Sequence, residues 1–578
     1  MMDIDDRVNL VPGNARSPSG FTDEPGLLGR VIGVTGAQAA VQLATNRSSP
    51  GAPDNAVTVG SLLGIATEKS LAIGALCEIS LDGGGRAIGR VDLLGEIIGA
   101  AAGEARFQPG MRTYPRLGDA VLTVDQTGLQ IVFDTGNPDA IAVGRLQQND
   151  TIAAHINAAE LVQKHFAVVG STGAGKSSAV ALILRKIMGA FTDLRILLID
   201  AHNEYGHCFG DRAQVLGPGN LKLPFWLFNF DEIVQIVFGS RTHTNREVSL
   251  LAELIPLAKT EYARSHTAAR ASYRPTQAEG GRFTVDTPVP YRLEDVIAAA
   301  ESRMGKLENG DLAVQYQRLL MRINLARTNP RYAFIFDDAG TAGDVMVEFL
   351  CQLLRLNDQK RPMAVVQLAG FPAETMEVIV SVLFRLAFEF GVWSDALSPL
   401  LIVCEEAHNY ANADRTAGFA PARDGLSRIA KEGRKHGVFL GLITQRPHQL
   451  DATLISQCST VFAMRLGHKD DQAIVGSAVS EAASRLLSFL PSLGTREALA
   501  IGAAVPTVMR LRFEELPPDS IPKSQVVWGG ALDVDRIGKE LIAAVVARWR
   551  GIAASTKPAA ESKASPPPGA GDFSKWSA

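Results

Sequence analysis

Gly170-Ser-Thr-Gly-Ala-Gly-Lys-Ser177 matches the pattern G-x-x-x-x-G-K-[ST] of a phosphate-binding loop. The apolar run Phe166–Val169 before it predicts a strand, and residues 178–187 after it predict an amphipathic helix. The motif requires this strand–loop–helix context. Its glycines let backbone N–H groups turn toward phosphate oxygens, and the helix N-terminus adds a positive dipole end. We therefore expect this segment to bind a nucleotide.

Two side chains of this loop carry specific chemistry. Lys176 can reach the β- and γ-phosphates of ATP, and the Ser177 hydroxyl can hold Mg²⁺. The residues expected to contact the nucleotide are Gly170, Ser171, Thr172, Gly173, Ala174, Gly175, Lys176, Ser177 and Ser178.

An acidic segment follows the next predicted strand, Ile196–Asp200. Ligands bind at the carboxyl edge of open α/β sheets, so Asp200 is expected to join the nucleotide site. Asp200 and Glu204 can order water or the loop at 170–177. A turn-forming role for Asp200 is the alternative.

Leu400–Cys404 predicts another buried strand, and two adjacent carboxylates follow it. In P-loop enzymes one acid orients the Mg²⁺ shell and another polarises the attacking water. We expect Glu405 on the metal side and Glu406 as the general base. Two solvated acids at a strand end are the alternative.

Polar and basic residues near the next strand complete the candidate site. Gln445, with Thr444 as the second choice, lies at the tip of the strand Phe439–Thr444 and can sense the γ-phosphate. Arg428 and Arg434 precede that strand, and a guanidinium can stabilise charge on a transferred phosphoryl group. A solvated basic helix end is the alternative for either arginine.

Composition and charge limit the function classes. The 578 residues hold 46% hydrophobic and 20% charged residues with a net charge of −4, which excludes a basic coat over the whole surface. The five cysteines form no C-x-x-C pair, so neither a zinc site nor a disulfide framework is indicated. The acidic N-terminus does not resemble a signal peptide, and no apolar run is long enough to span a membrane. A cytoplasmic protein is expected.

The chain divides by composition into four segments. Residues 1–25 predict a flexible arm, and the short Gly-punctuated runs of 26–150, which include Ala142–Arg145, predict a small β-barrel, with an open sandwich as the alternative. Residues 151–515 predict an α/β core with a helical insertion at about 225–330. Residues 516–578 predict a C-terminal extension with a disordered tail from about 553.

Short apolar runs predict the strands of a parallel sheet wound by helical crossovers. The candidate strands are Phe166–Val169, Ile196–Asp200, Tyr332–Phe336, Ala364–Leu368, Leu400–Cys404 and Phe439–Thr444.

These motifs together resemble the HerA branch of the HerA–FtsK ATPases, over about residues 26–515. The matching pieces are Lys164–Ser177, Ile199–Tyr205, Val403–His408, Glu432–Gly437, Thr444–Pro447, Leu454–Cys458 and Leu490–Ala498. The resemblance implies a RecA-like core, an N-terminal barrel of the HAS type and six subunits closed into a ring. It further implies duplex DNA in the pore and a nuclease or defence effector as partner. Lys164 stands where many relatives carry an arginine that acts across the subunit interface.

Two hypotheses for the function follow. The first is a homohexameric, ATP-driven translocase on double-stranded DNA that works with a nuclease or effector in DNA end processing or antiviral defence. The second is a nucleotide-gated scaffold ring that assembles and activates an effector. A secretion-type pump is a third, less favoured without a membrane anchor.

Overall fold

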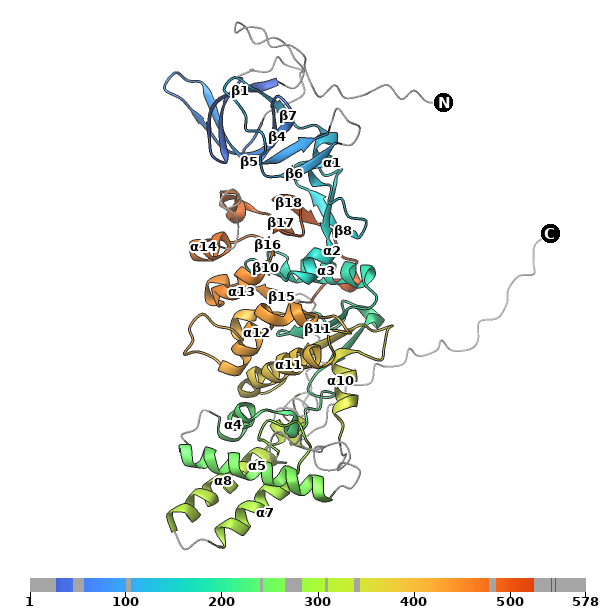
Figure 1. Ribbon diagram of the computed structural model, residues 1–578, viewed down its shortest axis with the longest axis vertical. Coiled ribbons are helices and arrows are strands. Elements are labelled where there is room, and N and C mark those ends of the chain that lie inside the picture. Colours follow the sequence, from blue (N-terminus) through green and yellow to red (C-terminus); the bar gives the residue numbers. More distant parts are fainter. Residues whose placement is uncertain are drawn as a thin grey trace, which may run out of the picture.

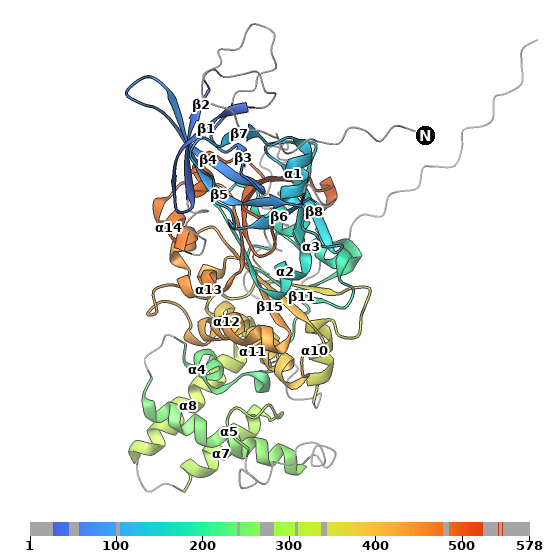
Figure 2. The ribbon, with the colours of Figure 1, turned by 45° about the horizontal axis from the view of Figure 1, so that its top comes forward.

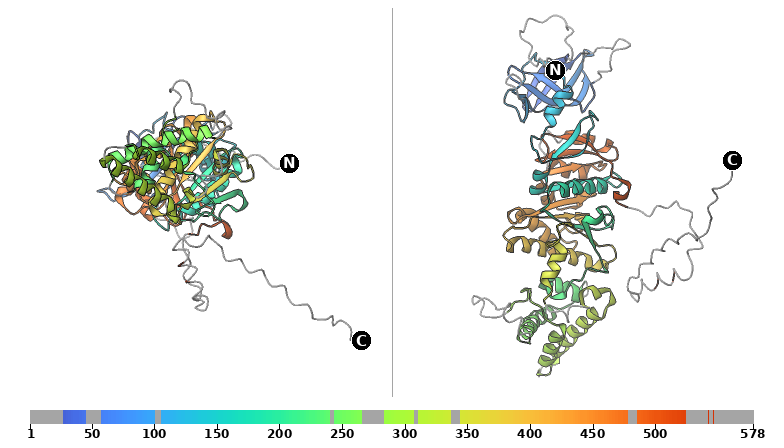
Figure 3. Two further views of the ribbon diagram at one scale, coloured as in Figure 1. Left: turned by 90° about the horizontal axis from the view of Figure 1, so that it is seen from below. Right: turned by 90° about the vertical axis from the view of Figure 1, so that its right-hand side faces the viewer.

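The structure, a computed structural model of the chain, describes residues 27–44, 57–99, 105–239, 243–265, 283–306, 310–336, 344–477 and 485–523, with the single positions 542 and 546. The expected arm at 1–25 and the expected tail lie outside these residues. The described residues stack along one long axis, with a β-barrel at one end, an α/β core in the middle and a group of helices at the other end (Figure 1). The same order is visible from the side in Figure 3.

The N-terminal strands form a closed barrel, drawn in blue in Figures 1 and 2. Its strands are β1 (Leu27–Thr35), β2 (Gln38–Leu43), β3 (Leu62–Ala66), β4 (Leu71–Leu81), β5 (Ala87–Ile98), β6 (Arg106–Pro109) and β7 (Ala120–Thr123). Among the described residues they pair in the order β2-β1-β7-β3-β4-β5-β6, and a further β2–β5 pairing closes the sheet. The predicted barrel is therefore confirmed over the open sandwich.

The core is one sheet with a parallel part and an antiparallel edge. Its strands are β8 (Ala140–Leu146), β9 (Ala153–Asn157), β10 (Phe166–Val169), β11 (Arg195–Asp200), β12 (Ala213–Leu216), β13 (Met363–Gln367), β14 (Leu400–Cys404), β15 (Val438–Thr444), β16 (Thr460–Ala463), β17 (Glu497–Gly502) and β18 (Met509–Phe513). In the described chain, β12-β13-β11-β14-β15-β10-β16 run parallel, and β17-β18-β8-β9 extend them antiparallel. The predicted parallel α/β core is confirmed.

Two strand predictions were wrong in detail. Tyr332–Phe336 is helical, because the Asn329 side chain accepts a hydrogen bond from Arg331 N–H and Pro330 begins a 3-10 turn (Pro330–Tyr332), which α9 (Ala333–Phe336) follows. The run Ala142–Arg145 lies in β8, which pairs with β18 of the core and not with the barrel. Short apolar runs fit either structure, and tertiary partners decide between them.

Helices cover the core sheet and form the far end of the molecule. Around the core and between it and the barrel lie α1 (Gln126–Phe133), α2 (Ala158–Gln163), α3 (Lys176–Ala190), α10 (Met346–Leu354), α11 (Ala373–Trp393), α12 (Ala420–Glu432), α13 (Ala452–Gln457) and α14 (Lys469–Ser477). The far end holds α4 (Phe230–Phe238), α5 (Asn245–Ser265), α7 (Leu293–Met304) and α8 (Gly310–Thr328) (Figure 1). Within the described ranges, none of the helices is both long and apolar enough to cross a membrane.

An ion pair ties the far helices to the core. Arg385 of α11 lies 2.8 Å from the carboxylate of Glu232 in α4, and Glu232 is fully buried. Glu232 also completes a capping box with Asn229 at the start of α4 and accepts a hydrogen bond from Ser381. Because each carboxylate oxygen has partners, the charge is compensated where the two parts meet.

Candidate active site

The phosphate-binding loop joins β10 to α3 as its sequence predicts. The four residues of β10 are buried, and α3 begins at Lys176. Gly173 and Gly175 adopt positive φ angles of 74° and 98°. A Cβ atom at Gly175 would also lie 3.1 Å from the backbone nitrogen of Arg496, so a side chain there meets both backbone strain and a steric obstacle.

The predicted acids lie at the same edge of the sheet as this loop. Glu405 and Glu406 follow the end of β14, which runs parallel to β10 through β15. Both carboxylates are buried, at 4% and 5% relative exposure. Burial raises the pKa of Glu406, and the charge of the nearby Lys176 acts in the opposite direction. The two acids are therefore not solvated strand-end residues.

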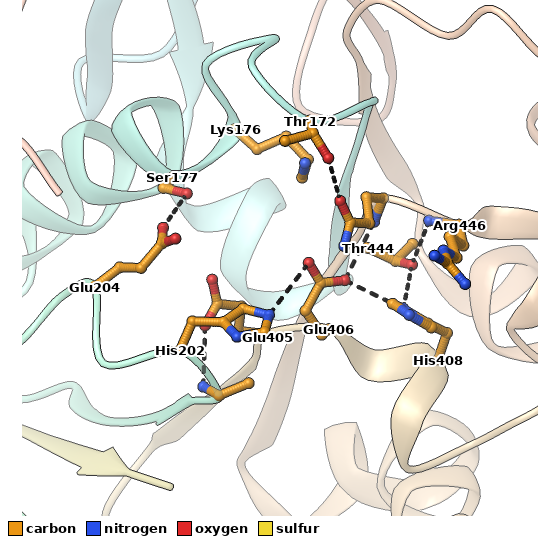
Figure 4. Close-up of polar contacts among 12 residues, drawn as sticks. Thr172, Lys176, Ser177, His202, Glu204, Glu405, Glu406, His408, Thr444 and Arg446 are labelled. Atoms are coloured by element: carbon orange, nitrogen blue, oxygen red, sulfur yellow. Dashed lines mark hydrogen bonds and ion pairs between the residues drawn. The ribbon is translucent and has the colours of Figure 1, made fainter. Parts of the chain in front are cut away.

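Lys176 lies between the loop backbone and these acids (Figure 4). Its Nζ atom donates to the carbonyl oxygen of Ser171 at 3.2 Å. Burial lowers the pKa of Lys176, and the charges of Glu406, Glu405 and Glu204 act in the opposite direction. An ammonium enclosed in this way can exchange its carbonyl contact for phosphate oxygens.

Glu204 is the acid that touches the loop helix. The Ser177 hydroxyl donates to Glu204 Oε2 at 2.7 Å (Figure 4). Glu405, expected to share a metal with Ser177, instead accepts from the backbone N–H of Ala201 at 3.0 Å. The predicted Ser177–Glu405 pair is thus not in direct contact, and Glu204 stands in the position expected for Glu405.

Asp200 builds the turn that places Glu204. Its two carboxylate oxygens accept the backbone N–H groups of Glu204 and Tyr205, each at 3.0 Å, and it is fully buried. This geometry fits the turn-forming alternative. The Asp200 carboxyl also hydrogen-bonds that of Glu405, so Asp200 contacts one of the two acids after β14 as well as the turn that carries Glu204.

The oxygen groups near the loop fit magnesium. In the part of the chain that the structure describes, no group of three or more His, Cys, Asp or Glu side chains is arranged to hold a metal by itself. Mg²⁺ at nucleotide sites needs few protein ligands, because phosphates and water supply the others. The Ser177 hydroxyl with the neighbouring Glu204 and Glu405 carboxylates offers such a hard-oxygen set.

Gln445 connects the loop to the second acid. Its side-chain oxygen accepts from the Thr172 hydroxyl at 2.6 Å, and its backbone N–H donates to Glu406 Oε2 at 3.5 Å. The predicted strand-tip residue therefore contacts both the phosphate-binding loop and the candidate base.

The three basic residues lie at the opposite edge of the sheet. Lys164 precedes β10 and Arg434 precedes β15, whereas the loop follows β10. Arg434 donates to the carbonyl oxygens of Lys164 at 3.3 Å and Gln457 at 2.7 Å. Arg428 stacks over the Phe388 ring at 4.2 Å. A four-residue strand spans on the order of 13 Å, so these cations do not reach a nucleotide held by the same chain.

Sequence reasoning missed two contacts of the site. Arg496 packs against the loop, and its backbone N–H donates to the Ala174 carbonyl at 2.8 Å. His408 lies 3.2 Å from Glu406. The spacing of His408, two residues after a predicted catalytic acid, was a usable signal, whereas nothing local to Arg496 indicates that it reaches residue 174.

Comparisons with known proteins relate the chain to several ATPases and helicases. Residues 141–387 match the family described as the central domain of helicase HerA. The chain is 26% identical over 431 residues to the DNA double-strand break repair helicase HerA of Pyrococcus furiosus, covering 69% of this chain and 74% of that protein. It is 25% identical over 442 residues to a probable helicase of Methanocaldococcus jannaschii, covering 73% and 76%. The solved structure of VirB4 of Thermoanaerobacter pseudethanolicus aligns with a TM-score of 0.44 at 14% identity, covering 66% of this chain and 98% of that one.

A glycine-rich loop between β10 and α3, two acids after β14 and a polar strand tip after β15 define a P-loop ATPase. Within that class, the chain resembles the HerA helicases over most of its length. The site is that of an ATPase, and several of these relatives are named helicases.

Glu405→Gln is expected to flatten the pH dependence of stability in nucleotide-free, metal-free protein. Burial, with Asp200 and Glu204 adding, raises the pKa of Glu405 to about 9. Between the ordinary value of 4.5 and about 9, the folded state keeps a proton that the unfolded state releases, so wild-type stability falls as pH rises. The variant lacks this contribution. Melting temperatures from pH 5 to 9 in EDTA should fall less steeply for the variant, and parallel curves would contradict the prediction.

Proposed function

We propose that this chain is a motor that hydrolyses ATP and translocates on double-stranded DNA as a homohexameric ring. The observation that supports this proposal most is that the candidate site residues fall into two groups. The phosphate-binding loop and the acids lie at one edge of the parallel strands, and Lys164, Arg428 and Arg434 lie at the other. If both sets act on one nucleotide, the basic set must come from a second copy. Head-to-tail contacts of this kind generate rings when the rotation closes.

The proposed chemistry uses the residues at the loop edge. The backbone N–H groups of 170–177 and the Lys176 ammonium bind the ATP phosphates. Ser177, with Glu204 and Glu405, would hold Mg²⁺, which neutralises charge on the β- and γ-oxygens when bound. Glu406 accepts the proton of the attacking water, and Gln445 reports the state of the γ-phosphate to the strand tip.

The proposed role of Lys164, Arg428 and Arg434 is to complete the nucleotide site of a neighbouring subunit. A guanidinium from Arg434 or Arg428 can stabilise charge on the transferred phosphoryl group, and Lys164 can add a positive charge without a bidentate fork. In the single chain Lys164 pairs with Glu160 at 2.5 Å, and its side chain is partly exposed, so it can exchange partners.

Duplex DNA is the proposed track. Relatives of the chain are named DNA double-strand break repair helicases. A net charge of −4 is compatible with DNA binding if a few basic residues per subunit are repeated around a ring. The proposed partner is a nuclease or a defence effector, and the barrel and the far helices offer it two separate ends of the molecule (Figure 1).

The test combines solution mass with steady-state ATPase activity, with and without linear duplex DNA. A particle of six chain masses whose turnover rises with DNA supports the motor. A hexamer indifferent to DNA favours the scaffold ring that activates an effector. A monomer that turns over ATP at the same specific rate at every concentration would contradict the shared site.

A further inference from the structure

A histidine without an assigned role lies against the candidate base. His408 belongs to the 3-10 turn η5 (Ala407–Asn409), directly after Glu406, and its side chain is buried. Its Nδ1 atom lies 3.2 Å from Glu406 Oε2 and 3.0 Å from the hydroxyl oxygen of Thr444, the last residue of β15 (Figure 4). One imidazole nitrogen therefore contacts both the base and the strand tip.

The contacts of Glu406 differ between its two oxygens. Oε2 faces His408 and accepts from the Gln445 backbone, whereas Oε1 has a longer contact of 4.0 Å to the half-exposed ring of His202. The backbone of Glu406 has a φ angle of +47°, a left-handed conformation that a non-glycine residue keeps only when its surroundings hold it. One anchored oxygen and one freer oxygen suit a carboxylate that must keep its orientation and accept a proton.

His408 carries a single ring proton near neutral pH. Burial lowers the pKa of His408 to about 4, with the charge of Arg446 as the next cause, so the ring is neutral near pH 7. An ionised carboxylate only accepts hydrogen bonds, so Nδ1 must carry the single proton if it bonds Glu406. Thr444 accepts from Arg446 N–H at 3.0 Å, which extends the contacts into the loop after β15.

The same contacts reach the phosphate-binding loop. Thr172 of the loop bonds Gln445, Gln445 bonds Glu406, and Glu406 contacts His408 (Figure 4). His408 then returns to Thr444, which directly precedes Gln445. Two sets of contacts therefore connect the loop with the base, one through Gln445 and one through Thr444 and the imidazole.

We propose that His408 is a positioning residue for hydrolysis, which holds the Glu406 carboxylate through Nδ1 and couples it to the tip of β15. This inference rests on the proposed function, because it assigns Glu406 as the base. His408 itself touches neither water nor phosphate in this scheme. Its removal should slow the chemical step and leave nucleotide binding in place.

Three substitutions separate this role from packing. His408→Asn keeps a nitrogen at the position of Nδ1, His408→Gln keeps one at the position of Nε2, and His408→Phe keeps only the ring shape. We expect kcat to fall about 10- to 100-fold in the Gln and Phe variants, with KM for ATP within about threefold of wild type. The Asn variant should stay within about threefold of wild-type kcat. Binding of a non-hydrolysable ATP analogue and the melting temperature establish that each variant is folded.

The outcomes distinguish this inference from the function on which it rests. Wild-type kcat in His408→Phe overturns the positioning role. Equal losses in the Asn and Gln variants assign the residue to packing and overturn it as well. Glu406→Gln is measured alongside: if it is inactive while His408→Phe is fully active, only this inference fails. Full turnover in Glu406→Gln overturns the base assignment together with the inference.

Discussion

Glu406→Gln is expected to bind ATP with near wild-type affinity and to hydrolyse it at least about a hundredfold more slowly. The amide has nearly the shape of the carboxylate and can keep the contact to the backbone N–H of Gln445. It cannot accept a proton from water. Glu406 is a buried carboxylate at the loop edge of the sheet. Among the described residues, no other acid lies beside both Gln445 and His408 to replace it.

The measurement pairs turnover with equilibrium binding. Steady-state phosphate release gives kcat, and titration with a fluorescent ATP analogue gives the dissociation constant. Glu78→Gln in the barrel is the matched control, because it removes a partly exposed carboxylate far from the loop. Loss of binding in Glu406→Gln would mean that the residue contributes to nucleotide affinity. Unchanged turnover would mean that it takes no part in the chemical step.

The sequence was most informative where one motif constrains both backbone and chemistry. The loop at 170–177 predicts a strand before it and a helix after it, and β10 and α3 occupy those places. Tyr332–Phe336 carries no such constraint. Its composition fits a buried strand, and the helical start is set by the Asn329 side chain and Pro330 just before it.

The sequence predicts those parts of the site that directly follow the ends of parallel strands. Residues that follow parallel strands gather at one edge, which brings Lys176, Glu406 and Gln445 together. The same rule places residues that precede strands, such as Lys164 and Arg434, at the opposite edge. Glu204 contacts the loop at Ser177, in agreement with its expected role in ordering the loop. The strand-end rule alone does not give this contact, because the position of Glu204 depends on a turn whose backbone N–H groups are held by Asp200.

Lys176→Ala is expected to lower both binding and turnover, in contrast to Glu406→Gln. The Lys176 ammonium is enclosed between the loop backbone and the acids, and it donates a hydrogen bond to the Ser171 carbonyl. Without it, the carboxylates of Glu204 and Glu406 would face the ATP phosphates with no compensating charge from the loop. Repulsion among these anions should weaken ATP binding, and loss of charge stabilisation in the transition state should lower kcat by about 10²- to 10³-fold.

Lys186→Ala is the matched control for this prediction. Lys186 lies on the same helix, α3, and its ammonium is 3.4 Å from Glu514 in a partly exposed pair. Removal of that charge should leave ATP affinity and turnover close to wild type, because exposed pairs contribute little. Affinity is read from the same analogue titration, and turnover from phosphate release. If Lys176→Ala bound ATP as tightly as Lys186→Ala, the acids could not be facing the phosphates as the geometry requires, and the assignment of this edge would have to be revised.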